Sequence, residues 1–167
     1  SVVRCEDIRG NIQTRIRKMD EGLYDAIILA AAGLKRMKMV NPPADGLEEY
    51  FETNGMYDFH YFDCEMFIPA GGQGILAVEG RIEDRTCELA VRIQDEEAKT
   101  CLILERKILK LLEAGCHEPI GVYSRIRNEQ IEVFGINRRN GETKRVYLTG
   151  GTGELDLLAE RAAKGLR

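Results

Sequence analysis

The chain has 167 residues, of which 44% are hydrophobic and 31% are charged, and its formal net charge is −4. This composition is typical of folded globular domains and excludes a disordered chain. The longest apolar stretch, residues 26–34, is far shorter than the roughly 20 residues that a membrane-spanning helix needs. We therefore expect neither a membrane span nor a membrane partner.

The cysteines indicate a reducing compartment. They are odd in number, widely spaced and contain no C-x-x-C pair, so neither a disulfide framework nor a zinc site is expected. The first residues do not resemble a secretory signal, and they include no initiator methionine. We expect a cytoplasmic protein with free thiols, present here as a piece of a longer chain.

Charge is unevenly distributed. The first 40 residues hold eight basic and five acidic side chains, whereas the rest of the chain is acidic. No aromatic residues alternate with these bases to stack on nucleotides, which argues against nucleic acid as a partner. A compact anionic ligand at the basic end fits the pattern better.

The first segment reads as a βαβ unit. Residues 2–5 and 26–30 are apolar runs, and the second predicts a strand buried on both faces of a parallel sheet. Between them, apolar residues recur at helical spacing from Ile12 to Leu23, and Gly22 stands where a left-handed helix cap belongs. Ligands of such folds bind beyond the carboxyl ends of the strands, where the turn at residues 9–11 lies.

Arg9 and Arg15 flank this turn. Two guanidinium groups beside free helix N-terminal amides suit a carboxylate or a phosphate. The alternative, equally favoured by the spacing, is that both are solvated charges paired with Glu6 or Asp7.

The middle of the chain is less regular. Pro42 and Pro43 end the preceding helix, residues 47–51 predict a short helix, and the aromatic run 57–67 predicts a strand. His60 in that run has no ligand-like spacing, so we expect a packing or surface residue and no metal site. The loop at 69–74 lacks the G-K-[ST] ending of a phosphate loop and indicates a hinge or a close backbone contact.

The last part predicts an α+β unit. A helical stripe that includes Cys101 and ends at Gly115 precedes three strands, at 120–126, 131–136 and 145–149. Asn140-Gly141 predicts the turn between the last two strands, and Thr152 is the expected cap of a closing helix.

Cys116 stands out among the cysteines because it follows Gly115 and precedes the sequence HEPIG. This context predicts an accessible loop thiol, which could react with an electrophile or be an inert surface group. His117 is adjacent in sequence, but neighbouring side chains rarely face each other, so a Cys116–His117 nucleophilic dyad is the weaker alternative.

Several motifs, in this order, resemble the porphobilinogen deaminase (hydroxymethylbilane synthase) family. They are RGNIQTR at 9–15, YDAIILA at 24–30, AGLKR at 32–36, GQG at 72–74, ER at 105–106, EAGC at 113–116 and PIG at 119–121. Each is short, but the ordered set spans nearly the whole chain and is specific.

The resemblance implies a transferase of haem and porphyrin biosynthesis that deaminates porphobilinogen and joins it into the linear tetrapyrrole hydroxymethylbilane. Cys116 matches the cysteine that carries the dipyrromethane cofactor as a covalent thioether. Arg9, Arg15 and Arg36 match positions that bind carboxylates of the cofactor or of the growing polypyrrole, and Gly10 and Ala30 are the remaining expected cofactor-binding residues. The complete enzyme is expected to be a monomer.

The resemblance also implies a fold. Residues 1–68 would be part of a periplasmic-binding-protein-like, parallel-sheet α/β domain with a long connection, 69–86 a hinge returning to a first domain, and 87–167 an α+β domain with a three-stranded antiparallel sheet that carries the cofactor. Most of the first domain, with the family's catalytic aspartate, has no counterpart here. We therefore expect no catalytic residue in this chain, no activity from it alone, and a cofactor that the isolated piece need not assemble.

Two other functions stay open from the residues themselves. One is a noncatalytic anion-binding module, and the other is an unrelated enzyme that uses Cys116 and His117.

Overall fold

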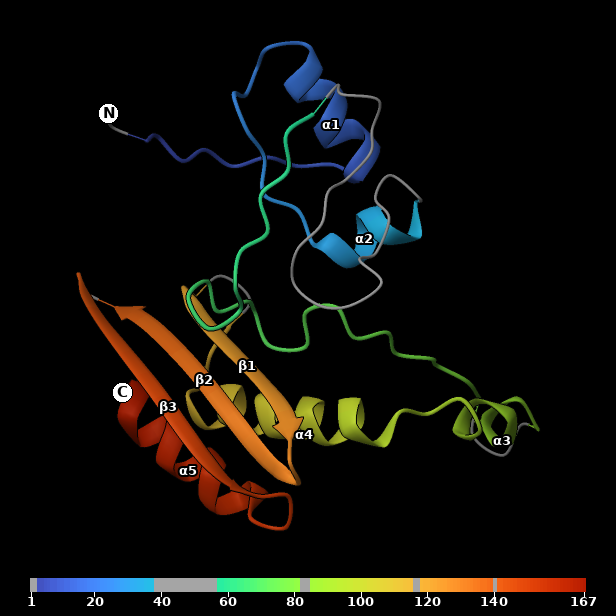
Figure 1. Cartoon of the computed structure of the whole chain (residues 1–167), viewed down its shortest axis with the longest axis vertical. Coiled ribbons are helices and arrows are strands. Elements are labelled where there is room, and N and C mark those ends of the chain that lie inside the picture. Colours follow the sequence, from blue (N-terminus) through green and yellow to red (C-terminus); the bar gives the residue numbers. More distant parts are fainter. Residues whose placement is uncertain (1–2, 38–56, 82–84, 116–117, 140) are drawn as a thin grey trace. The chain divides into compact units, whose positions relative to one another are not determined.

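The computed structural model describes residues 3–37, 57–81, 85–115, 118–139 and 141–167. The chain divides into two compact units, residues 1–61 and 62–167, whose helices and strands are drawn in Figure 1. Each unit is described separately below.

Helix α1 (Ile12–Asp20) opens the first unit. The Asn11 side chain accepts a hydrogen bond from the Thr14 amide at 2.8 Å and so caps the helix N-terminus. At the other end Gly22 has a φ of 74°. Its amide bonds to the Met19 carbonyl, and the Leu23 amide bonds to the Lys18 carbonyl, which is the Schellman pattern. The predicted helix and its left-handed glycine are confirmed.

Helix α2 (Ala31–Arg36) packs closely on α1 through a glycine. A Cβ atom on Gly33 would lie 2.4 Å from Cδ1 of Ile12, so a larger residue there would displace the end of the Ile12 side chain. Leu34, next to it, is buried. The first unit therefore has a small apolar contact rather than an extended core.

The two strands expected in this unit are not formed by its described residues. Residues 3–5 and 26–30 run without ladder hydrogen bonds, and Ile28, predicted to be buried on both faces, is 61% exposed. The described residues form no parallel sheet in this part of the chain, because a strand needs a neighbour to accept its backbone hydrogen bonds and none of them supplies one. The expected helix at 47–51, together with Pro42 and Pro43, lies outside the described residues.

The aromatic run forms a turn where a strand was expected. The Asp63 carbonyl accepts the Phe67 amide at 2.7 Å, and the Asp63 carboxylate accepts the Glu65 amide at 2.6 Å. An aspartate that bonds to the backbone two residues ahead favours a turn over a ladder, which explains the difference.

The second unit contains an antiparallel sheet of β1 (Ile120–Arg127), β2 (Gln130–Arg139) and β3 (Glu142–Gly151), in that order. Asn128 and Glu129 both have positive φ, as a two-residue type I′ hairpin requires. At the second hairpin, Arg139 pairs with Glu142 around residues 140–141, and Gly141 has a φ of 84°. The three predicted strands and this turn position are confirmed.

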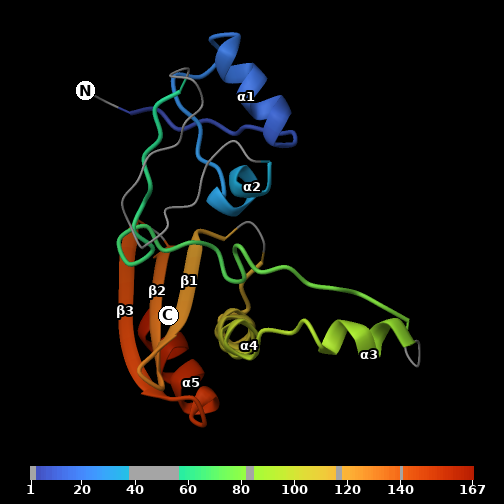
Figure 2. The same ribbon diagram turned by 45° about the vertical axis from the view of Figure 1, so that its right-hand side comes forward.

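Three helices complete the unit: α3 (Arg85–Val91), α4 (Glu96–Leu111) and α5 (Leu155–Leu166). Helices α4 and α5 cover the same face of the sheet, as Figure 2 shows with the strands seen nearly edge-on. Between helices and sheet lies the core, with twelve buried residues: Cys101, Leu104, Ile108, Leu112, Val122, Ile131, Val133, Leu158, Ala159, Ala162, Ala163 and Leu166.

Two helix ends differ from the prediction. Helix α4 is ended by Glu113, which has a φ of 54°, and not by Gly115. The amides of Glu113 and Ala114 bond back to Lys110 and Leu109. Thr152 does not cap α5: Glu154 holds the cap position, without a capping side chain, because its carboxylate turns back to the Gly151 amide at 2.9 Å.

Candidate functional site

Two predicted arginines lie at the N-terminal end of α1. Arg15 is half-buried, and its Nε donates a hydrogen bond of 2.8 Å to the Gly10 carbonyl. Arg9 is exposed, and its carbonyl accepts from the Lys18 ammonium at 3.0 Å. Neither arginine forms an ion pair with another described residue. Glu6, offered above as a partner, pairs with Arg4 instead.

The backbone of this turn is shaped for close packing. Gly10 has a φ of 124°, and a Cβ atom there would lie 2.7 Å from Cγ2 of Thr14. Gly10 is therefore required by the turn itself, whatever binds there. Among the described residues, the Ile12 and Gln13 amides have no acceptor, so the end of α1 offers N–H groups together with the free guanidinium nitrogens of Arg15.

The remaining predicted residues of the first unit lie at α2. The Ala30 carbonyl accepts the Gly33 amide at 3.0 Å, so Ala30 immediately precedes the helix. Arg36 is the last residue of α2, and its side chain lies outside the described part of the structure.

Cys116 and His117 lie outside the described residues, but both flanks of their loop are defined. On one side, the Ala114 amide bonds to the Leu109 carbonyl at 3.1 Å. On the other, Glu118 forms an ion pair of 3.0 Å with Arg139, and the Pro119 carbonyl accepts the Arg138 amide at 3.1 Å. The described residues before Cys116 thus belong to the cap of α4, and those after His117 bond to the C-terminal end of β2.

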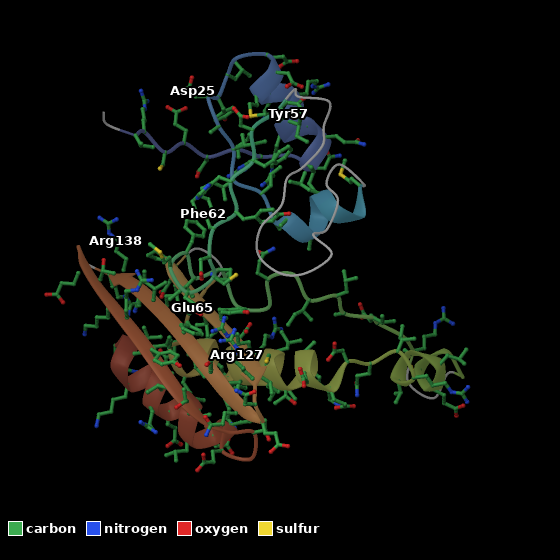
Figure 3. The ribbon with its side chains drawn as sticks, in the orientation of Figure 1. Asp25, Tyr57, Phe62, Glu65, Arg127 and Arg138 are labelled. Atoms are coloured by element: carbon green, nitrogen blue, oxygen red, sulfur yellow. The ribbon has the colours of Figure 1, made fainter. Side chains whose placement is uncertain are left out.

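The outer face of the sheet carries an ion-pair cluster that the sequence reading missed. Arg125 bonds to Glu132 on the neighbouring strand and to Glu65 of the 63–67 turn, each at 2.5 Å, and its guanidinium lies 5.3 Å from the Phe134 ring centre. Figure 3 labels Glu65 in this region. In the sequence, the alternation of charged with apolar residues along each strand could have indicated that these charges share one face of the sheet.

Arg125 and Glu132 each stabilise the charged form of the other. Burial lowers the pKa of the Arg125 guanidinium, but the hydrogen bonds to Glu132 and Glu65 outweigh it and raise that pKa above its usual range. The hydrogen bond from Arg125 holds the pKa of the Glu132 carboxyl below its ordinary value. Both groups are therefore charged over the whole neutral range.

Arg145 and three aromatic rings extend the same face. Arg145 donates to the carbonyls of Glu65 and Met66, so two arginines hold the 63–67 turn against the strands. Tyr123, Phe134 and Tyr147 stack across β1, β2 and β3, with ring centres 6.0 and 4.9 Å apart. Arg125 and Arg145 therefore serve structural attachment, since both already bond to the 63–67 turn.

An open, negatively charged hollow lies between the start of α4 and the turn that joins β3 to α5. Its lining includes the acidic side chains of Glu96, Glu97 and Glu129, together with Thr152. Such a surface repels polyanions. Within the described residues, no group of three or more histidine, cysteine or acidic side chains is arranged to hold a metal ion, and no helix is long and apolar enough to cross a membrane.

The donor set at α1 suits a ligand that carries carboxylate groups. Arginine forks and free backbone amides bind carboxylates through charge-assisted hydrogen bonds. The described residues of this end offer no competing carboxylate to Arg9 or Arg15.

Comparison with known proteins gives a consistent result over nearly the whole chain. Residues 1–89 match the family "Porphobilinogen deaminase, dipyromethane cofactor binding domain", and residues 99–165 match "Porphobilinogen deaminase, C-terminal domain". The first match ends in α3, and the second covers most of α4 with the sheet and α5.

Individual relatives agree. The porphobilinogen deaminase of Clostridium acetobutylicum is 38% identical over 148 residues, which cover 89% of this chain and 46% of the relative. The porphobilinogen deaminase of Acidithiobacillus ferrooxidans is 38% identical, over 80% of this chain and 39% of the relative. That of Clostridium perfringens is 34% identical, over 94% of this chain and 49% of the relative. The chain spans less than half the length of each of these relatives.

Proposed function

Because the chain belongs to the porphobilinogen deaminase family, we propose that it forms the cofactor-carrying part of an enzyme that deaminates porphobilinogen and polymerises it to hydroxymethylbilane. The observation that carries this proposal is the match of both segments, 1–89 and 99–165, to domains of that one family.

Cys116 is proposed as the anchor, through a thioether bond from its sulfur to the dipyrromethane. When bound, the dipyrromethane supplies the primer on which the pyrrole chain is extended. A polarizable thiolate is the suitable nucleophile for such a bond, and the described residues on either side of Cys116 are held in place. The cap at Ala114 and the Glu118–Arg139 pair hold these flanks.

Arg9, Arg15 and Arg36 are proposed to hold carboxylates of the cofactor and of the growing chain, with Gly10 and Ala30 as backbone contacts. Each pyrrole brings two carboxylates, so the bound chain accumulates negative charge that must be neutralised where water is partly excluded. The described geometry supports this role for Arg15, because its Nε bond to Gly10 orients the guanidinium and leaves the terminal nitrogens to donate.

The first unit is proposed to complete a periplasmic-binding-protein-like sheet with polypeptide from the part of the family protein that this chain does not span. The 61% exposure of Ile28 supports that partner, because an extended apolar segment without ladder bonds is open to strand pairing. Leu76 and Val78 of the second unit, each more than 60% exposed, are open to pairing in the same way. The domain boundaries proposed are 1–68, 69–86 and 87–167. The complete enzyme is proposed to be a cytoplasmic monomer.

The noncatalytic module remains the second candidate, since the described residues contain no assigned acid or base for the reaction. An unrelated cysteine enzyme is disfavoured by the family membership.

The decisive experiment is reconstitution. The chain is co-expressed with the segment of the Clostridium acetobutylicum deaminase that it does not cover, and porphobilinogen consumption is measured together with the intact mass of the purified chain. We expect consumption, and a mass increase equal to one dipyrromethane on the peptide that contains Cys116. Cys116→Ala should abolish both, while Cys87→Ala, a matched change outside the proposed site, should abolish neither.

Co-purification of the two pieces without consumption or adduct would favour the noncatalytic module. Activity that survives Cys116→Ala would overturn the anchoring role.

A further inference from the structure

A single buried carboxylate joins three segments that are distant in sequence. Oε1 of Glu105, on α4, accepts the Ser124 amide at 2.7 Å and the Ser124 hydroxyl at 2.9 Å. Its Oε2 accepts the Gly72 amide at 2.6 Å. The Glu105 residue is only 4% exposed, so these donors replace the water that a carboxylate normally binds.

No described cation pairs with this carboxylate. Burial raises the pKa of the Glu105 carboxyl, and the hydrogen bonds from Gly72 and Ser124 oppose that rise without cancelling it. The titratable neighbour is the buried Cys101 thiol one turn earlier on α4, whose pKa is raised by burial and, more weakly, by the charge of Glu105. Gly72 and Ser124 bring no titrating group. A buried acid held by backbone amides is costly to retain unless its bonds fix something in place.

The loop that contains Gly72, residues 69–73, packs tightly on α4 and β1. The Pro69 carbonyl accepts the Val122 amide of β1 at 2.9 Å. A Cβ atom on Gly71 would lie 2.8 Å from Cδ1 of Leu109, and Gly72 has a φ of 78°. A side chain at position 71 would displace the end of Leu109, and the backbone conformation at position 72 favours glycine.

The loop ends in a hydrogen-bonded turn, in which the Ile75 amide bonds to the Gly72 carbonyl at 3.2 Å, and residues 76–81 beyond it are exposed. Gly74 has a φ of 86°, and nothing lies within 4 Å of its Cβ direction. The chain then runs without ladder bonds to residue 81, with Leu76 and Val78 exposed.

We propose that Glu105 is a latch that fixes the loop 69–73 to α4 and β1, so that this loop moves with α4 and the sheet, and the flexible point of the expected hinge lies beyond the turn that ends at Ile75. This places the flexible point after the loop and not throughout the expected hinge 69–86. The proposal is independent of the proposed reaction.

The first test is amide hydrogen exchange by NMR on the full chain. We expect the Gly72 amide to exchange about 10–100-fold faster in Glu105→Gln, since the single amide oxygen keeps the two bonds from Ser124 and the NH₂, which cannot accept, then faces the Gly72 amide. Glu97→Gln, the same change at an exposed site of the same helix, should leave Gly72 unchanged. A folded Glu105→Gln protein with unaltered Gly72 exchange would overturn the latch.

The second test needs no variant and covers the case in which Glu105→Gln does not fold. In the unmodified chain, the amide proton shifts of Gly72 and Ser124 should titrate together with one shared midpoint, above that of exposed glutamates. Heteronuclear NOE values should be as high at residues 70–73 as in α4 and fall beyond Ile75. Separate midpoints, or low NOE values throughout 69–73, would contradict the proposal.

Discussion

Arg125 and Glu132 are register partners across β1 and β2, and the same guanidinium also holds Glu65 of the 63–67 turn. One cation thus links two strands to a segment about 60 residues earlier in the chain. The pair lies on the face of the sheet that α4 and α5 do not cover, so its bonds, and not the core, attach the turn.

Replacing Arg125 by methionine should lower the free energy of unfolding by about 1–3 kcal/mol, because Glu132 and Glu65 lose their shared partner while the methionine keeps the apolar contact with Phe134. Urea denaturation followed by circular dichroism measures the change. Arg138→Met, at an exposed site near the opposite end of the sheet from Arg127 (Figure 3), is the control and should cost less than about 0.5 kcal/mol. Equal losses in the two variants would show that the ion pairs contribute nothing.

Glu132→Gln should change how stability depends on pH. The folded pKa of Glu132 lies below its ordinary value of 4.5, so the unfolded chain binds its proton first as the pH falls. The stabilising contribution is therefore complete above the ordinary carboxyl range and is lost through and below it. Melting temperatures of the two proteins should differ at pH 7 and converge as the pH falls below 4.5; a gap that persists in acid would argue against this coupling.

Glu113→Gly should stabilise the second unit by about 0.5–1 kcal/mol, because a residue with a side chain is strained in the left-handed conformation that ends α4. The same change at Glu97, within the first turn of α4 where φ is helical, should destabilise by up to about 1 kcal/mol. Chemical denaturation of both variants gives the two signs, and destabilisation by Glu113→Gly would contradict the cap geometry.

Gly121→Ala should loosen the attachment of residues 68–69. The added Cβ would stand 2.5 Å from the Ile68 carbonyl oxygen and 2.9 Å from Cγ2 of Ile136, so the backbone must move at a cost of about 1–3 kcal/mol. Gly153→Ala, where the added carbon meets nothing within 4 Å, is the control. Faster exchange of the Val122 amide in the first variant alone is the expected readout.

Arg15→Leu should reduce porphobilinogen consumption by about 10–100-fold in the reconstituted enzyme proposed above, since a charged hydrogen bond to a carboxylate is lost. Arg17→Leu, which removes an exposed arginine paired with Glu21 at 3.7 Å, should leave the rate nearly unchanged. Circular dichroism of both variants separates a loss of binding from a loss of folding. Unchanged consumption with Arg15→Leu would refute its proposed role.

Local signals in the sequence were sufficient for helix α1 with its Gly22 cap, for the three strands of the sheet and for the turn at Gly141, because each depends on neighbouring residues or on period-two alternation. They failed for residues 26–30. Their apolar character is real, but strand pairing depends on a partner, and no described residue supplies one.

The buried position of Glu105 could not be read in advance, since a glutamate in a helix is ordinarily solvated. Only the fold brings the Gly72 and Ser124 amides to it, from 33 residues before and 19 after. The same holds for Arg125, whose partners come from another strand and a distant turn.

By itself, the sequence determined the family, through ordered motifs that need no coordinates, and the local elements whose hydrogen bonds close within a few residues. The tertiary structure alone decided which charges are buried and which loop is bonded to α4 and β1, because those properties arise from contacts between segments far apart in the chain.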